Sequence, residues 1–206
     1  MHREIFRSYE QLFDRIEFDG PVLEVGAIPS RKSLLCLPRL AQTERVGINL
    51  DGPHTFDGFE IVKGSACDMP FEDDRFGLVV CNAVIEHVPD FWNVLSEIKR
   101  VAKPGGLVVI GAPGYRQFRS VEWMQGYGRR FLPWLHNNAH LNALFTATMT
   151  FQIHNEPGDY YRFSDQAFRE VVMGGLEKIE VTSLMWPPRL LGVGTKPAGS
   201  NKQAAR

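Results

Sequence analysis

The feature that most constrains the fold is a series of short apolar runs between residues 22 and 111, separated by turn residues and by amphipathic stretches. Runs this apolar are typical of strands buried on both faces, as in a parallel sheet covered by helices. The expected strands cover residues 21–26, 45–50, 59–63, 76–81 and 107–111. Their alternation with helical patterns predicts an α/β fold with helices on both faces of the sheet.

Apolar residues also recur at helical spacing outside these runs. Ile5, Tyr9 and Leu12 lie three or four positions apart and predict one buried helix face over residues 4–18. Ser164 is suited to cap a later helix. Further helices are expected over 30–40, 91–101 and 164–173, and two last strands over 178–184 and 190–195.

The composition of the 206-residue chain excludes several classes of protein. With 44% hydrophobic and 23% charged residues, a packed core is expected. The formal net charge of -1 argues against a nucleic-acid partner. Three cysteines without CxxC spacing, and histidines without ligand spacing, predict no metal site. No apolar run reaches membrane-spanning length or forms a secretory signal, so a cytoplasmic location is expected.

One domain is expected over residues 1–196, since no internal repeat or composition break divides the chain. Residues 115–161 interrupt the strand–helix alternation and are rich in aromatic residues, glycine and asparagine. Long segments of this kind are often binding loops, so we expect an insertion that forms a lid over the active site. The polar residues 197–206 are expected to form a flexible tail.

Four runs in the core resemble, in order, the motifs of class I S-adenosylmethionine-dependent methyltransferases. They are Val22–Gly26 (VLEVG), Phe71–Val80 (FEDDRFGLVV), Val84–Val88 (VIEHV) and Ala102–Gly106 (AKPGG). Four ordered matches over about ninety residues are more specific than one glycine motif. The resemblance implies a Rossmann-like methyltransferase fold: a seven-stranded, mostly parallel sheet whose last hairpin is antiparallel. It also implies S-adenosyl-L-methionine as the cofactor.

The resemblance assigns cofactor contacts to the strand ends. Glu24 matches the acidic residue that helps to hold the amino-acid end of the cofactor. Asn49 stands where a carboxylate usually accepts from the ribose hydroxyls, and Ser65 where an aspartate usually accepts from the adenine amino group. Asn82 matches a position whose backbone carbonyl meets the methionine amine. The full set expected to bind the cofactor is Glu24, Gly26, Ala27, Asn49, Leu50, Ser65, Ala66, Asn82 and His87.

The first loop departs from the family pattern. Gly26 and Ala27 are followed by Ile28, Pro29 and Ser30 instead of further glycines. The missing G-x-G-x-x-G argues against a nicotinamide-dependent oxidoreductase. Because Asn49 offers only a neutral acceptor, about 1–3 kcal/mol of cofactor binding is lost unless Asp51 or Asp68 compensates. A non-catalytic relative that serves as a scaffold or binding partner is therefore the alternative to an enzyme.

A second signature lies at the end of the insertion. Residues 154–164 (HNEPGDYYRFS) resemble an H-x-x-P-x-D-Y-Y-R-F-[ST] run found in small methyltransferases that are often associated with glycan assembly. The resemblance implies a small-molecule or glycan-type acceptor, methylated on oxygen or nitrogen. Oligomeric state is left open.

This second signature also supplies the candidate catalytic and lid residues. His154 is the candidate general base, because imidazole titrates near neutral pH; the alternative is a histidine that braces the loop. Asp159 and Arg162 are expected to pair and lock the lid. Tyr160 and Tyr161 are expected to flank the sulfonium or a sugar ring, with one of the two in the core.

Overall fold

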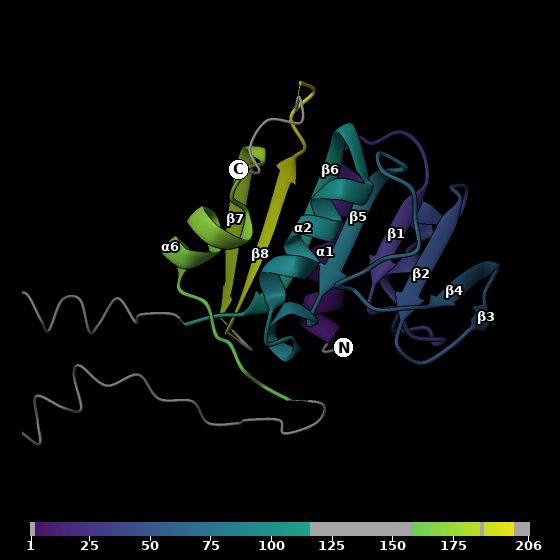
Figure 1. Ribbon diagram of the computed structural model, residues 1–206, viewed down its shortest axis with the longest axis horizontal. Helices are drawn as coiled ribbons and strands as arrows, with labels where there is room; N and C mark the ends of the chain where they lie inside the picture. The colour runs from purple at the N-terminus through teal and green to yellow at the C-terminus, as the bar shows by residue number, and fades with distance from the viewer. Residues whose placement is uncertain (1–2, 116–157, 186–187, 200–206) are drawn as a thin grey trace, which may run out of the picture.

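The computed structural model describes residues 3–115, 158–185 and 188–199, and the described residues build one eight-stranded sheet in the order β3-β4-β2-β1-β5-β6-β8-β7 (Figure 1). The strands are β1 (Val22–Val25), β2 (Arg45–Asn49), β3 (His54–Phe56), β4 (Phe59–Lys63), β5 (Phe76–Asn82), β6 (Ala102–Pro113), β7 (Glu177–Met185) and β8 (Pro188–Thr195). The helices are α1 (Arg3–Arg15), α2 (Phe91–Val101) and α6 (Asp165–Ala167). Single helical turns are η1 (Leu34–Cys36), η2 (Pro38–Leu40), η3 (Ile85–His87) and η4 (Phe168–Val172).

The sheet has the predicted mixture of strand directions. Strands β4, β2, β1, β5 and β6 pair in parallel, and β8 and β7 close that side as an antiparallel hairpin. The eighth strand is β3, which adds an antiparallel edge beyond the seven expected strands. It forms because Asp57 and Gly58 both adopt positive φ, as a two-residue hairpin turn requires, so that Phe56 pairs with Phe59. The predicted fold class is confirmed.

Helices cover both faces of the sheet (Figure 1). On one face α1 buries Tyr9 and Phe13 against a cluster that includes residues of η1 and η2. On the other face α2 buries Val94 and Ile98 in a second cluster that also receives Phe168 and Val172 of η4. Strand β5 lies between the two clusters and is buried from Phe76 to Cys81, which explains its uninterrupted apolar sequence.

The helix predicted over residues 30–40 is wrong. This segment forms two short 3₁₀ turns, η1 and η2, separated by the extended residue Leu37 (ψ 134°). Pro38 disfavours helical conformation in the residue before it, so one continuous helix cannot form. The helix predicted over residues 164–173 is present as α6 followed by the wider turn η4, and the Ser164 hydroxyl caps it by accepting from the Ala167 amide.

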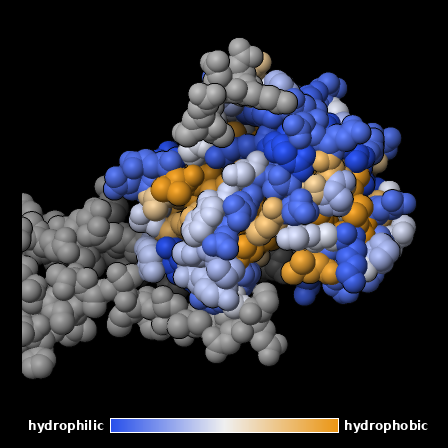
Figure 2. All heavy atoms as spheres, in the orientation of Figure 1, coloured by the Kyte–Doolittle hydropathy of each residue, from blue (hydrophilic) through white to orange (hydrophobic). Residues whose placement is uncertain are grey.

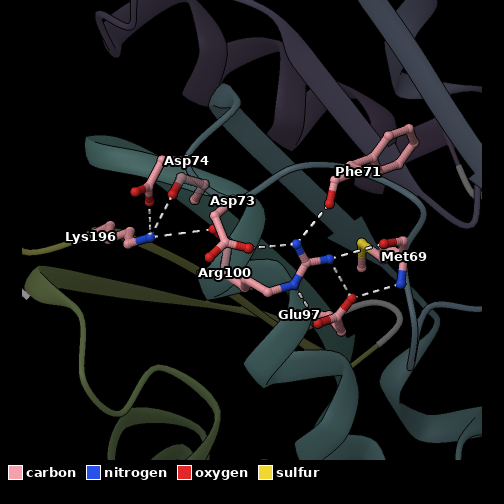
Figure 3. Close-up of polar contacts among 8 residues, drawn as sticks. Met69, Phe71, Asp73, Asp74, Glu97, Arg100 and Lys196 are labelled. Carbon is pink, nitrogen blue, oxygen red and sulfur yellow. Dashed lines mark hydrogen bonds and ion pairs between the residues drawn. The ribbon is translucent and has the colours of Figure 1, made fainter. Parts of the chain in front are cut away.

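A guanidinium holds the connection between β4 and β5 in place (Figure 3). Arg100, near the end of α2, donates to the backbone oxygens of Met69 at 2.9 Å and Phe71 at 2.7 Å. Glu97, one turn earlier, accepts from Arg100 and from the Met69 amide at 2.6 Å. The network fixes the end of the segment that carries Ser65.

The ammonium of Lys196, which follows β8, binds the same region (Figure 3). Lys196 is 9% exposed, and its Nζ donates to Asp74 and to the carbonyl oxygens of Arg100 and Ala102. These carbonyls lie at the end of α2, where a cation is favourable. The residue that follows β8 is thereby tied to the start of β6.

The outer surface is mixed in character. Figure 2 shows hydrophilic side chains over most of the α2 face, with hydrophobic patches over β2 and β4 and near α6 and β7. No helix among the described residues is both long enough and apolar enough to cross a membrane.

Candidate cofactor and acceptor site

Four residues assigned to the cofactor from sequence lie along one edge of the sheet. Asn49 and Asn82 are the last residues of β2 and β5, Gly26 follows β1, and Ser65 follows β4 by two residues. Since these strands are parallel neighbours in the order β4-β2-β1-β5, the four positions follow one another as Ser65, Asn49, Gly26 and Asn82. Ligands of open α/β sheets bind at this carboxyl edge.

Gly26 makes the turn that leaves β1. Its φ is +81°, and a Cβ at this position would lie 2.5 Å from Cγ2 of Val84. Its amide and that of the fully buried Ala27 donate to the Ile48 carbonyl oxygen at 2.9 and 3.2 Å. Packing within the protein therefore requires a glycine here, whether or not a cofactor binds, because the turn after β5 lies directly against this residue.

Glu24, in β1, binds the segment that follows the Gly26 turn. Its side chain is buried in β1 and accepts from the Ser33 hydroxyl and from the amides of Leu34 at 3.1 Å and Leu35 at 3.2 Å. Burial raises the pKa of the carboxyl, and these three donors act in the opposite direction. Glu24 thus anchors η1 to β1. A direct contact with the amino-acid end of a cofactor remains a prediction.

Asn49 links the turns after β1 and β2. Its Nδ2 donates to the Ala27 carbonyl oxygen at 2.7 Å, and its Oδ1 accepts from the Asp51 amide at 3.1 Å. The next two side chains are open to solvent: Leu50 is 72% exposed, and the Asp51 carboxylate is 92% exposed. The edge of β2 therefore offers one engaged amide and one exposed carboxylate, whose Oδ2 lies 3.4 Å from Nε2 of His54.

Ser65 begins a tight turn after β4. Its hydroxyl accepts from the Cys67 amide at 3.1 Å, and its carbonyl oxygen accepts from the Asp68 amide at 3.2 Å. Ala66 is half-buried against the α2-side core. The turn leads directly into Met69, which the Arg100 network holds.

Asn82 receives two donors from distant parts of the chain. Its Oδ1 accepts from the Tyr9 hydroxyl at 3.2 Å and from Nη1 of Arg189 at 3.0 Å. Nη2 of Arg189 lies 3.8 Å from Oε1 of Glu86, a buried carboxyl. Sequence reasoning did not assign Tyr9, Glu86 or Arg189 to the site. The available signals were the hydroxyl on a buried helix face and the glutamate of the VIEHV run.

The residues before α6 lie against η3, the turn that follows β5. Nδ1 of His87 donates to the Gly158 carbonyl oxygen, and the Tyr160 amide donates to the Glu86 carbonyl oxygen at 2.8 Å. The Tyr161 hydroxyl donates to the Pro89 carbonyl oxygen at 2.6 Å. The described part of the second sequence signature, from Gly158 on, is thus brought to the same edge as Asn82.

Asp159 and Arg162 form the expected ion pair. Both oxygens of Asp159, a carboxylate that is 2% exposed, accept from the guanidinium, which raises the pKa of Arg162. Of the two tyrosines, Tyr161 packs into the core against Phe91, with ring centroids 4.9 Å apart, whereas Tyr160 is 56% exposed. Tyr160 is the one available to a ligand.

Two sequence predictions cannot be placed. His154 and residues 116–157 of the expected lid lie outside the described residues. Among the side chains that the structure does describe, no group of three or more His, Cys, Asp or Glu residues is arranged to hold a metal ion.

Comparison with known protein families and sequences finds methyltransferases over the central part of the chain. Residues 38–110 match a family model described as a methyltransferase domain. The demethylmenaquinone methyltransferase of Lysinibacillus sphaericus is 44% identical over 28% of this chain and 27% of its own length. The enzyme of the same name from Bacillus subtilis is 44% identical over 26% of this chain and 23% of its own. The chain thus spans about a quarter of the curated relatives it matches.

Similarity to solved structures extends over nearly the whole chain. A Bacillus halodurans protein to which methyltransferase activity has been ascribed shares a TM-score of 0.59 at 14% identity, over 94% of this chain and 99% of its own. A Haemonchus contortus phosphoethanolamine N-methyltransferase was solved in complex with S-adenosyl-L-methionine. It has a TM-score of 0.56 at 14% identity, over 95% of this chain and 53% of its own. The protein therefore has the Rossmann-like methyltransferase fold.

Proposed function

We propose that this protein is an S-adenosylmethionine-dependent methyltransferase. The observation that carries the proposal is the row Ser65, Asn49, Gly26 and Asn82 along the carboxyl edge of a methyltransferase fold. The match of residues 38–110 to a methyltransferase domain, and relatives named as methyltransferases, support it.

The residues along this edge fit the cofactor chemically. Asp51 offers the ribose hydroxyls the exposed carboxylate that Asn49 lacks, and Ser65 offers an oxygen to the adenine side. At the other end, we assign the backbone carbonyl of Asn82 to the amino-acid group, as the family resemblance implies. The bound sulfonium supplies an activated methyl group and a thioether leaving group. The work left to the chain is to orient the acceptor and exclude water.

The acceptor side of the proposed site lies beyond β5. Tyr160, from the segment before α6, is exposed in that part of the edge, whereas Arg189 of β8 and Arg162 are mostly buried and Glu86 of η3 is buried. A small-molecule or glycan-type acceptor with a hydroxyl or amine suits an exposed tyrosine beside these charged groups. We assign His154 as the candidate base that removes its proton, and residues 115–161 as the lid.

One observation favours a second candidate function. Both polar atoms of the Asn49 side chain and both oxygens of Glu24 already serve contacts within the protein. A protein in which these residues are purely structural would keep the fold as a scaffold and bind the cofactor weakly or not at all.

Titration calorimetry with S-adenosylhomocysteine, with NADH as the control nucleotide, tests cofactor binding. We expect saturable heat with the first ligand and none with the second. Transfer of label from methyl-labelled S-adenosylmethionine to a panel of hydroxyl- and amine-bearing glycans and small molecules then separates enzyme from scaffold. Absence of binding at millimolar ligand rejects the cofactor assignment and supports the scaffold, and transfer of label to any acceptor supports the enzyme.

A further inference from the structure

We propose that Glu86 and Arg189 are positioning residues that act through Asn82 and couple binding of the cofactor's amino-acid end to the ionisation of the Glu86 carboxyl. The inference rests on the proposed function, because it concerns the same cofactor. It adds a dependence of cofactor affinity on a side chain that need not touch the cofactor.

The geometry begins at Asn82, the last residue of β5. Its side-chain oxygen is held from two sides, by Tyr9 of α1 and by Arg189 of β8. Gly111 of β6 makes this possible, since a Cβ there would lie 2.1 Å from the Tyr9 hydroxyl oxygen and 2.8 Å from Oδ1 of Asn82. Because Gly111 carries no side chain, the Tyr9 hydroxyl of α1 can pass β6 and reach Asn82 at the end of β5.

Arg189 connects this arrangement to Glu86. One guanidinium nitrogen bonds Asn82, and the other lies 3.8 Å from Oε1 of Glu86, beyond hydrogen-bonding distance. The other carboxyl oxygen, Oε2, is buried and has no hydrogen-bond partner among the described residues. Arg189 is itself 14% exposed, so solvent screens the pair little. The charge of Glu86 therefore acts strongly on the guanidinium that orients Asn82.

Groups from every neighbouring element face Glu86. Arg189 of β8, His87 of η3 and Arg162 from the segment before α6 favour the ionised form. Burial opposes it and dominates, so the pKa of Glu86 lies above its usual range. Tyr9 and Cys81 also interact electrostatically with this carboxyl. Burial raises the pKa of both groups, so they stay neutral when Glu86 ionises.

The direction of the coupling follows from charge. When Glu86 is protonated, the positive charge of Arg189 beside Asn82 is not neutralised, and it repels the ammonium of an amino-acid ligand. When Glu86 is ionised, it neutralises that charge and holds the guanidinium against Asn82. Binding therefore favours the ionised form, and a ligand that binds near the pKa of Glu86 releases part of a proton.

Calorimetry of S-adenosylhomocysteine binding in buffers of different ionisation enthalpy measures this proton directly. For the unaltered protein we expect affinity to rise about fivefold as the pH is raised through the titration of Glu86, which lies above the usual carboxyl value of about 4.3, with a fraction of a proton released over the same range. Glu86→Gln keeps the shape of the side chain and removes the ionisation, so proton release and the rise in affinity disappear. Glu10→Gln, at an exposed position next to Tyr9, should behave like the unaltered protein.

Tyr9→Phe separates the orientation of Asn82 from the ionisation of Glu86. It removes one of the two donors to Asn82 and leaves the Glu86–Arg189 pair intact, so affinity should fall at every pH while proton release persists. No binding at any pH rejects the cofactor assignment and this coupling with it. Normal binding with no proton release, or with equal release in Glu86→Gln, overturns the coupling alone.

Discussion

Val84 occupies the space that a side chain at Gly26 would need. The two residues follow different strands, β1 and β5, and meet where a Cβ on Gly26 would approach Cγ2 of Val84 to 2.5 Å. The turn expected to carry the cofactor and the turn that begins the VIEHV run are therefore one packed unit. Disturbing either residue should disturb both turns.

Gly26→Ala should cost more stability than a glycine substitution with similar backbone strain. Gly105 is the matched control, since its φ is +76° and nothing lies within 4 Å of its Cβ position. Gly105→Ala should cost about 1 kcal/mol for the left-handed conformation alone. Gly26→Ala adds the overlap with Val84, which Val84→Ala in the same chain should partly relieve. Urea denaturation measures all of these; equal costs for the two glycines would argue against the packed unit.

Asp159→Asn should be strongly destabilising, because Arg162 would be left with its charge poorly compensated in a site where its side chain is 14% exposed. Breaking a buried pair in this way typically costs about 3–5 kcal/mol. The control is Asp165→Asn, which breaks the exposed pair with Arg169 and should cost less than about 1 kcal/mol. Chemical denaturation of both variants tests the difference. Similar small losses would show that the Asp159 pair does not secure the segment.

Glu97 should make stability depend on acidic pH. The hydrogen bond from Arg100 is the main cause of its lowered pKa, with further help from the Met69 amide. A carboxyl whose pKa is lowered by folding stabilises the protein above its unfolded pKa of about 4.3, and this contribution is lost as pH falls through the folded value. Glu97→Gln should lower stability at neutral pH by about 2 kcal/mol and flatten its dependence on pH in the acid range. Denaturation curves at several pH values measure this, with the exposed Glu10→Gln as control; an unchanged acid slope would contradict the assignment.

The hydrophobic pattern of the sequence is sufficient to predict an element where that element buries one clear face. The α2 helix was predicted with its observed bounds, because Val94, Leu95 and Ile98 form a clear apolar face. The parallel strands were recognised because both of their faces are buried. The pattern was insufficient at residues 30–40, where apolar spacing suits a helix but Pro38 forces Leu37 to be extended. The edge strand β3 was missed because three residues carry too little periodicity.

The sequence by itself determined that Gly26, Asn49, Ser65 and Asn82 would share one edge, because parallel strands of one sheet bring their carboxyl ends to the same edge. Only the tertiary structure decided what holds that edge. Tyr9 and Arg189 reach Asn82 across 73 and 107 residues, and Val84 fills the space beside Gly26. Such contacts depend on how α1 and β8 pack on the sheet, and packing between distant segments leaves no periodic signal in the chain.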